Sequence, residues 1–128
     1  MSEYQQNVLF PGLEPYGPFY RLAAEDTVNR FAFDSDEKHA DGRGNIVRAV
    51  LAAFAQGAFE AAIQPPGGES GAVIVSITCD FVDDGRQGER IEALVSVVRR
   101  TNSLAFLTAD VTAKGRILLT ANALAKRS

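Results

Sequence analysis

The sequence contains no tryptophan, one cysteine (Cys79) and one histidine (His39). A single cysteine excludes an internal disulfide and a cysteine-rich zinc site. A Ser-His-Asp triad or a Cys-His dyad would have to use the one imidazole at His39. These absences exclude most metal and thiol chemistry, so we expect no metal ligands in this chain.

The sequence also lacks blocks of like charge and long apolar runs. Its 13 Lys and Arg residues stand against 16 Asp and Glu, for a net charge of -3, whereas nucleic-acid-binding proteins usually present a basic face. No run approaches the ~18 apolar residues of a membrane span, and residues 1–10 do not resemble a signal peptide. We therefore expect a cytoplasmic protein that binds neither nucleic acid nor membrane.

What is present is the composition of one ordinary globular domain. The chain has 128 residues, of which 46% are hydrophobic and 23% are charged, values typical of a compact domain with its own core. Residues 1–18 contain three of the five prolines, which predicts an irregular N-terminal arm. We expect a single domain over residues 1–128.

The residues after the arm predict a hairpin, a loop and one long helix. Residues 19–24 and 27–33 have the composition of two short strands joined by a turn. The polar, glycine-containing stretch 34–45 predicts a loop. Residues 46–63 contain few polar side chains, and a helix that is apolar nearly all round must be enclosed by the rest of the protein. The proline pair that follows ends this helix.

Four strand-like stretches follow the helix and are separated by short turns, as in an antiparallel meander. They cover residues 72–82, 89–100, 103–113 and 116–126. In the first stretch, alternation assigns five residues to one apolar face: Val73, Val75, Ile77, Cys79 and Phe81. The order of elements predicts an α+β fold in which a curved antiparallel sheet of about five to six strands wraps one long helix.

Residues 39–56 resemble a signature of hotdog-fold acyl-CoA thioesterases, the group that includes phenylacetyl-CoA and 4-hydroxybenzoyl-CoA thioesterases. The family pattern is H-x-N-x-x-G-x-x-H-G-G, followed after six residues by a catalytic Asp or Glu. His39 and Gly44 match it, and Asp41 stands at the Asn position. Further family-like features occur at their expected spacing: Gly17-Pro18-Phe19, VIVSITCDF from Val73, Gly88-Glu89, and RRTNSLAFLTADVT from Arg99.

This resemblance implies the hotdog fold, an acyl-CoA thioester as the substrate, and coenzyme A as part of that substrate rather than as a cofactor. It also implies a homodimer, whose sheets join edge to edge, or a homotetramer. The residues at the family's catalytic positions differ in this sequence, however. Val47, Arg48 and Ala49 replace His-Gly-Gly, Gln56 replaces the catalytic carboxylate, and Ile74 replaces a Ser or Thr that holds the attacking water.

Two catalytic roles follow from the resemblance. In the family, the backbone N–H after the second signature His polarises the thioester carbonyl, which assigns the N–H of Arg48 as the oxyanion donor. Gln56 can orient a water molecule but cannot accept its proton, so Asp41 is the nearest candidate base. The alternative role for Asp41 is to cap a turn or the helix N-terminus.

Six positions are candidates for substrate binding, and one of them is Ile74, which could widen or fill an apolar pocket. Arg99, Arg100 and Ser103 lie near the place where the family binds the phosphates of coenzyme A. Arginine suits phosphate because it engages two oxygens at once, although basic residues at strand ends are often only solubilising. His39 and Gly44 belong to the signature loop, where the alternative for His39 is a structural hydrogen bond to a backbone carbonyl.

Arg48, Gln56 and Glu60 form one polar stripe along the otherwise apolar helix. The stripe either lines a pocket at a subunit interface, or forms a structural hydrogen-bond network or a solvated strip. Two functions from different classes remain open. One is an acyl-CoA thioesterase, and the other is a catalytically inactive hotdog protein that binds acyl-CoA or another apolar ligand.

Overall fold

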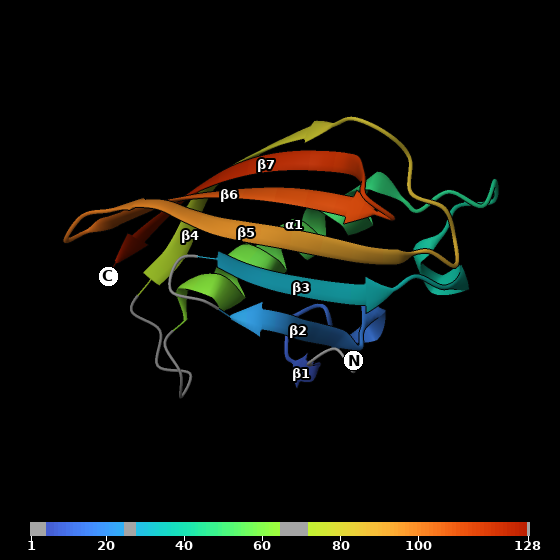
Figure 1. The fold of residues 1–128 in the computed structure, drawn as a ribbon, viewed down its shortest axis with the longest axis horizontal. Helices are drawn as coiled ribbons and strands as arrows, with labels where there is room; N and C mark the ends of the chain where they lie inside the picture. Colours follow the sequence, from blue (N-terminus) through green and yellow to red (C-terminus); the bar gives the residue numbers. More distant parts are fainter. Residues whose placement is uncertain (1–4, 25–27, 65–71, 128) are drawn as a thin grey trace.

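The computed structural model describes residues 5–24, 28–64 and 72–127 (Figure 1). Within these residues the only α-helix, α1, spans Arg48–Ile63. The strands are β1 (Gln6–Val8), β2 (Phe19–Ala24), β3 (Val28–Asp34), β4 (Ala72–Phe81), β5 (Arg90–Arg100), β6 (Leu104–Ala113) and β7 (Arg116–Arg127). Two short 3-10 helices, Glu14–Tyr16 and Glu37–His39, precede α1. The predicted α+β class is confirmed.

The described part of the sheet has seven strands, in the order β1-β2-β3-β5-β6-β7-β4, against an expected five to six. The additional strand is β1, which pairs with β2 in antiparallel register. It lies within the N-terminal arm, which is therefore more regular than its prolines indicated.

β4 does not form a meander with β5, as the sequence predicted. It pairs with β7 at the edge of the sheet, whereas β5 pairs with β3 and β6. Residues 82–89 therefore cross the end of the sheet from β4 to β5. The crossing covers about 14 Å, or three strand spacings, which eight residues span easily. Only β5, β6 and β7 form the meander.

A bulge in β4 changes which of its residues face the helix. The register shifts between Ile74 and Ser76, so Val73 and Val75 are 57% and 54% exposed. They do not share the inner face with Ile77, as the alternation predicted, and Ile74 packs against the core instead. One extra residue in a strand inverts the alternation on one side of it.

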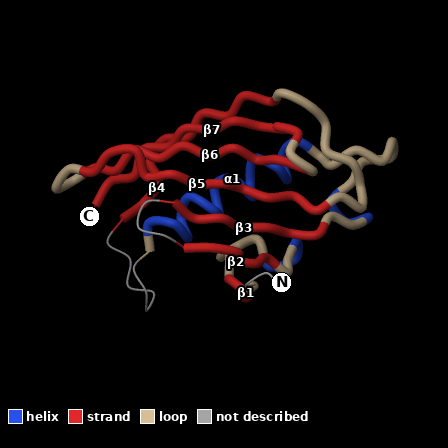
Figure 2. Tube along the Cα trace, in the orientation of Figure 1, coloured by secondary structure: helices blue, strands red, loops and turns tan. Residues whose placement is uncertain are grey.

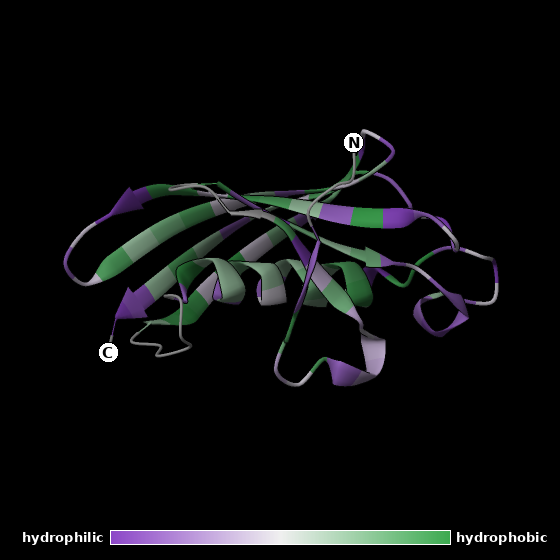
Figure 3. Ribbon diagram, turned by 60° about the horizontal axis from the view of Figure 1, so that its bottom comes forward, coloured by the Kyte–Doolittle hydropathy of each residue, from purple (hydrophilic) through white to green (hydrophobic). Residues whose placement is uncertain are grey.

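α1 lies on one side of the sheet and packs against β4, β5, β6 and β7 (Figure 2). Figure 3 shows that α1 is apolar along most of its length and lies beside the apolar surface of the sheet. Leu51, Phe54 and Phe59 are buried, because a sheet with one apolar face needs a cover. Neither α1 nor any other described helix is long and apolar enough to cross a membrane.

Phe10 fastens the N-terminal arm to α1. Its ring is buried and stacks on Phe19, with 4.4 Å between the ring centroids. A Cβ added at Gly57 of α1 would overlap the Phe10 ring, so this close approach of arm and helix requires glycine. The contact holds residues 11–13 against α1, where they line cavities together with helix residues.

Candidate functional site

The loop that precedes α1 is closed by Asp41. Its Oδ1 accepts hydrogen bonds from the backbone N–H groups of Arg43 at 2.7 Å and Asn45 at 3.1 Å. Gly44 in the same loop has a φ of 83°, in the left-handed region that favours glycine. Asp41 is exposed and bonds to its own loop, so its geometry favours turn capping over general-base catalysis.

Arg48 is the first residue of α1, and amides in the first turn of a helix have no acceptor within the helix. Val47, the N-cap residue, makes no side-chain capping hydrogen bond. The Arg48 guanidinium turns to the β4–β5 connection, where it lies 3.5 Å from Asp84 and 5.4 Å from the centre of the Phe81 ring. The Arg48 amide therefore lies at the positively polarised end of α1, the kind of position that the predicted oxyanion donor needs.

A largely apolar cavity of about 290 Å³ adjoins this first turn and lies between α1 and the N-terminal arm. Lys38 is the one charged residue in its wall, and its ammonium donates to the Gly17 carbonyl at 2.6 Å. Sequence reasoning missed this cavity because arm residues without a periodic pattern form one side of it. The lining consists of Leu13, Tyr16, Phe19, Lys38, Val47, Ala49, Val50, Ala53 and Phe54.

Gln56 lies on the exposed side of α1, and its Nε2 donates to the Glu60 Oε1 at 3.3 Å. Both side chains line a second cavity of about 140 Å³. Two residues of the predicted polar stripe, Gln56 and Glu60, therefore line a cavity and share a hydrogen bond. Arg48, Asp41 and Ile74 are in the wall of neither cavity. The other residues of the second cavity are Pro11, Gly12, Leu13, Ala53 and Gly57.

His39 is 1% exposed, and both of its ring nitrogens have partners. Nδ1 accepts a hydrogen bond from the Asp36 N–H at 2.9 Å, so Nε2 carries the proton and donates to the Tyr16 carbonyl at 2.7 Å. These bonds tie the signature loop to the N-terminal arm. The arrangement corresponds to the structural alternative for His39 and occupies both nitrogens.

Arg99, Arg100 and Ser103 lie around the β5–β6 turn and are exposed. Arg100 and Ser103 border a small cavity of about 40 Å³ together with Ile63, the last residue of α1. A helix of 16 residues is about 24 Å long, so this turn lies at the opposite end of α1 from Arg48 (Figure 1). One chain does not bring the predicted phosphate-binding residues and oxyanion donor together.

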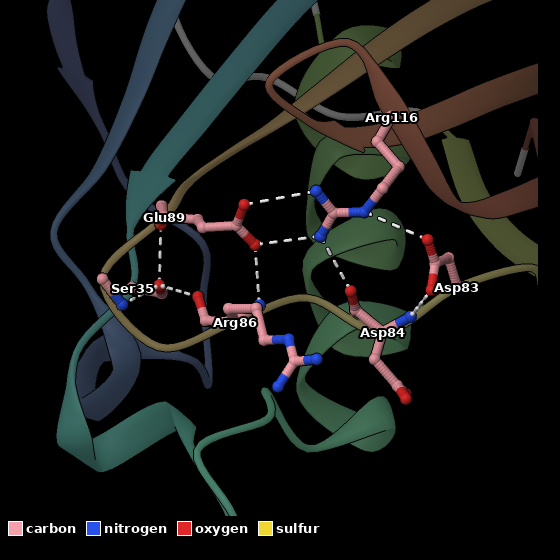
Figure 4. Close-up of polar contacts among 7 residues, drawn as sticks. Ser35, Asp83, Asp84, Arg86, Glu89 and Arg116 are labelled. Atoms are coloured by element: carbon pink, nitrogen blue, oxygen red, sulfur yellow. Dashed lines mark hydrogen bonds and ion pairs between the residues drawn. The ribbon is translucent and has the colours of Figure 1, made fainter.

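A charged cluster near the start of α1 was not predicted from the sequence (Figure 4). Arg116, the first residue of β7, donates to the two carboxylate oxygens of Glu89 at 3.0 and 3.3 Å and lies 3.1 Å from Asp83. It also donates to the Asp84 carbonyl at 2.9 Å. Arg116 therefore ties the β4–β5 connection, which carries the partner of Arg48, to the β6–β7 hairpin.

Glu89 should make the stability of the protein depend on pH. The Arg116 hydrogen bond holds the pKa of the Glu89 carboxyl below its ordinary value, against the opposing effect of burial. Such a carboxyl stabilises the fold above its unfolded pKa of about 4.3, and the stabilisation is lost as the pH falls through the folded pKa. We expect Glu89→Gln to lower the Tm by roughly 4 °C at neutral pH and to match the wild type in acid, as measured by circular dichroism.

Glu14→Gln is the matched control for this experiment, because Glu14 is an exposed glutamate in the 3-10 helix of the arm. This variant should follow the wild-type Tm at every pH. An equal loss of Tm by Glu89→Gln at neutral and acid pH would show that Glu89 acts through its shape rather than its charge.

Comparisons with known proteins agree with this architecture. Residues 43–120 match the family model of the thioesterase superfamily. The TT0310 protein from Thermus thermophilus is similar, with a TM-score of 0.81, 22% identity, and 94% of this chain and 100% of that chain covered. The PaaI protein from the E. coli phenylacetic acid degradation operon has a TM-score of 0.81 and 14% identity, over 91% and 83% of the two chains.

A hypothetical thioesterase from Streptococcus pneumoniae TIGR4, solved with coenzyme A, is also similar, with a TM-score of 0.81, 10% identity and 91% of each chain covered. No curated protein matches the sequence. The structural likenesses show the hotdog fold that the signature implied. Because the family model covers more than half of the sequence, the chain belongs to the thioesterase superfamily.

Proposed function

We propose that this protein hydrolyses an acyl-CoA thioester to a free acid and coenzyme A. The observation that carries the proposal is the first turn of α1, where Val47 and Ala49, the chain neighbours of Arg48, line the cavity of about 290 Å³, which Arg48 adjoins without lining it. A helix N-terminus stabilises negative charge that develops on a carbonyl oxygen, and a largely apolar cavity suits an acyl group. Membership of the thioesterase superfamily supports the same reaction.

Gln56 orients the attacking water in this proposal. Its amide can donate and accept hydrogen bonds but cannot take a proton from water. The reaction should therefore be slower than one with a carboxylate at this position, by about 10²- to 10⁴-fold. Asp41 shapes the loop before α1 through its bonds to Arg43 and Asn45 and contributes indirectly, by positioning the first turn.

The distance between the two groups supports the participation of a second copy of the chain. Arg48 and Gln56 are eight residues apart on α1, which separates them by about 12 Å along the helix axis. The donor to the carbonyl oxygen and the group that holds the water must both lie about 3 Å from their partners. In one chain the thioester, the water and the Gln56 side chain would have to span this distance together, whereas an antiparallel α1 from a second copy brings Arg48 close to Gln56 of that copy. We therefore propose a homodimer as the catalytic unit.

β4 offers the edge along which two copies can join. In the described part of the sheet it pairs with β7 alone, and an unpaired strand edge binds a strand of a second copy readily. Val73 and Val75 are exposed on this strand. Because α1 packs against β4, two joined β4 edges bring two α1 helices near one another.

The same antiparallel arrangement accounts for the phosphate-binding candidates. It places the β5–β6 turn of one chain, with Arg99 and Arg100, at the end of the dimer where α1 of the other chain begins. A coenzyme A molecule would then meet arginines from one copy and the Arg48 amide from the other. The coenzyme A bound to the similar Streptococcus pneumoniae protein supports this type of ligand.

A second candidate function is the binding of acyl-CoA without hydrolysis. It is favoured by one specific observation, which is that the one candidate base, Asp41, is engaged elsewhere and Gln56 cannot replace it. Gln56 is a neutral amide, and the Asp41 carboxylate is bonded to its own loop. A protein of this kind would keep the apolar cavity and lose turnover.

Thiol release from a panel of aromatic and short- to long-chain acyl-CoA substrates distinguishes the two functions. We expect release above the uncatalysed rate, and a fall in Gln56→Ala because the water is no longer held. Gln87→Ala is the matched control, since Gln87 is exposed in the β4–β5 connection and lines neither cavity. Absence of turnover in a folded protein that binds coenzyme A would assign the binding function instead.

A further inference from the structure

We propose that Leu13 limits the length of the acyl group that the site accepts, an inference that rests on the proposed action on acyl-CoA. Leu13 and Ala53 are the two residues that the cavities of about 290 Å³ and 140 Å³ have in common. The cavities therefore lie end to end along α1. Leu13 from the N-terminal arm and Ala53 from the helix form the partition between them.

The backbone holds this partition in place. The Leu13 N–H donates to the Phe10 carbonyl, and the Leu13 carbonyl accepts from the Tyr16 N–H, both at 2.9 Å. Phe10 is buried against Gly57 of α1, and the Leu13 side chain packs against the hydrophobic core. Leu13 is thus a fixed wall rather than a side chain on a loose arm.

The larger cavity lies between the first turn of α1, beside the proposed oxyanion donor, and Leu13. Val47 and Ala49, the chain neighbours of Arg48, line it near the start of the helix, and Leu13 and Ala53 line it next to the second cavity. An acyl group whose carbonyl oxygen accepts from the Arg48 amide extends along α1. Its far end then meets Leu13, and this contact limits the length of the group.

The cavity volumes indicate the class of acyl group. An apolar cavity of about 150 Å³ holds benzene, so about 290 Å³ accommodates an aromatic ring with a short chain or a medium-length aliphatic chain. The second cavity, of about 140 Å³, has Gln56 and Glu60 in its wall, so it belongs to the attacking water in the proposed function and adds no room for the acyl group.

The test compares Leu13→Ala with the wild type on saturated acyl-CoA substrates from butyryl-CoA to palmitoyl-CoA. Thiol release measures hydrolysis, and calorimetric titration with thioether analogues measures binding without hydrolysis. The wild type should hydrolyse and bind acyl-CoA substrates of medium chain length best. Leu13→Ala should prefer chains longer by roughly two or three carbons, which is the room that the removed side chain leaves, with binding strengthened about fourfold for each methylene that becomes buried. Leu13→Phe should shift the preference to shorter chains.

Leu9→Ala is the matched control, since it removes the same side chain from the same arm at a position that is 67% exposed. It should keep the wild-type length profile. An unchanged profile in a folded Leu13→Ala protein overturns the role of Leu13 and leaves the thioesterase function standing. Absence of thiol release contradicts the proposed hydrolysis, but the thioether titrations still test whether Leu13 limits the length of the bound acyl chain. Absence of both release and binding overturns both proposals.

Discussion

Arg48→Pro should remove most thioester hydrolysis and leave the fold intact. Arg48 is the first residue of α1, a position where proline is favoured because the amide has no acceptor within the helix. Val47 has a φ of -58° and a ψ of 128°, an extended conformation that suits the residue before proline. Proline removes the N–H proposed to bind the carbonyl oxygen, and loss of one such donor lowers kcat by about 10²- to 10³-fold.

Arg48→Ala is the control, because it removes the side chain and keeps the N–H. The side chain makes an ion pair with Asp84 in which both partners are about half exposed, and such a pair contributes little to stability. kcat for thiol release should therefore stay near the wild-type value in Arg48→Ala, and the Tm of both variants should stay close to that of the wild type. An equal fall of kcat in the two variants would assign the effect to the guanidinium and contradict the role of the amide.

Local sequence patterns were sufficient to predict α1 and the strands that follow it. α1 begins at Arg48, two residues after the predicted start, because the Ile46 N–H bonds to the Gly85 carbonyl at 2.8 Å and Val47 is extended. Strands β4 to β7 agree with their predicted ranges to within one residue. These segments are long and carry strong apolar patterns, which are the features that local reasoning detects.

Contacts between distant residues decided what the sequence could not predict. The position of β4 at the sheet edge depends on its pairing with β7, and the bulge near Val75 has no signal in the alternation itself. The sequence is consistent with Asp41 as either a base or a turn cap. Only the hydrogen bonds that its side chain accepts from the Arg43 and Asn45 amides distinguish the two roles. Leu13 lies in a proline-rich arm, and only its place against α1 makes it part of a site.

Gln56→Glu should raise the rate of thiol release by about 10²- to 10⁴-fold. The substitution supplies the carboxylate that the family signature has at this position, with nearly the same side-chain shape. Gln56 is exposed and lines the cavity of about 140 Å³, so the new charge stays in contact with water and costs little desolvation. The attacking water would then have an acceptor for its proton, which the amide cannot provide.

The pH dependence of kcat distinguishes general-base catalysis from improved binding. Glu60 Oε1 lies 3.3 Å from Gln56 Nε2, and a like charge so close raises the pKa of the introduced carboxyl. kcat of Gln56→Glu should therefore rise with pH through that pKa, and adding Glu60→Gln should move the rise to lower pH. The wild type should lack this rise. If Gln56→Glu is no faster than the wild type while acyl-CoA binding is retained, the attacking water does not lie at position 56.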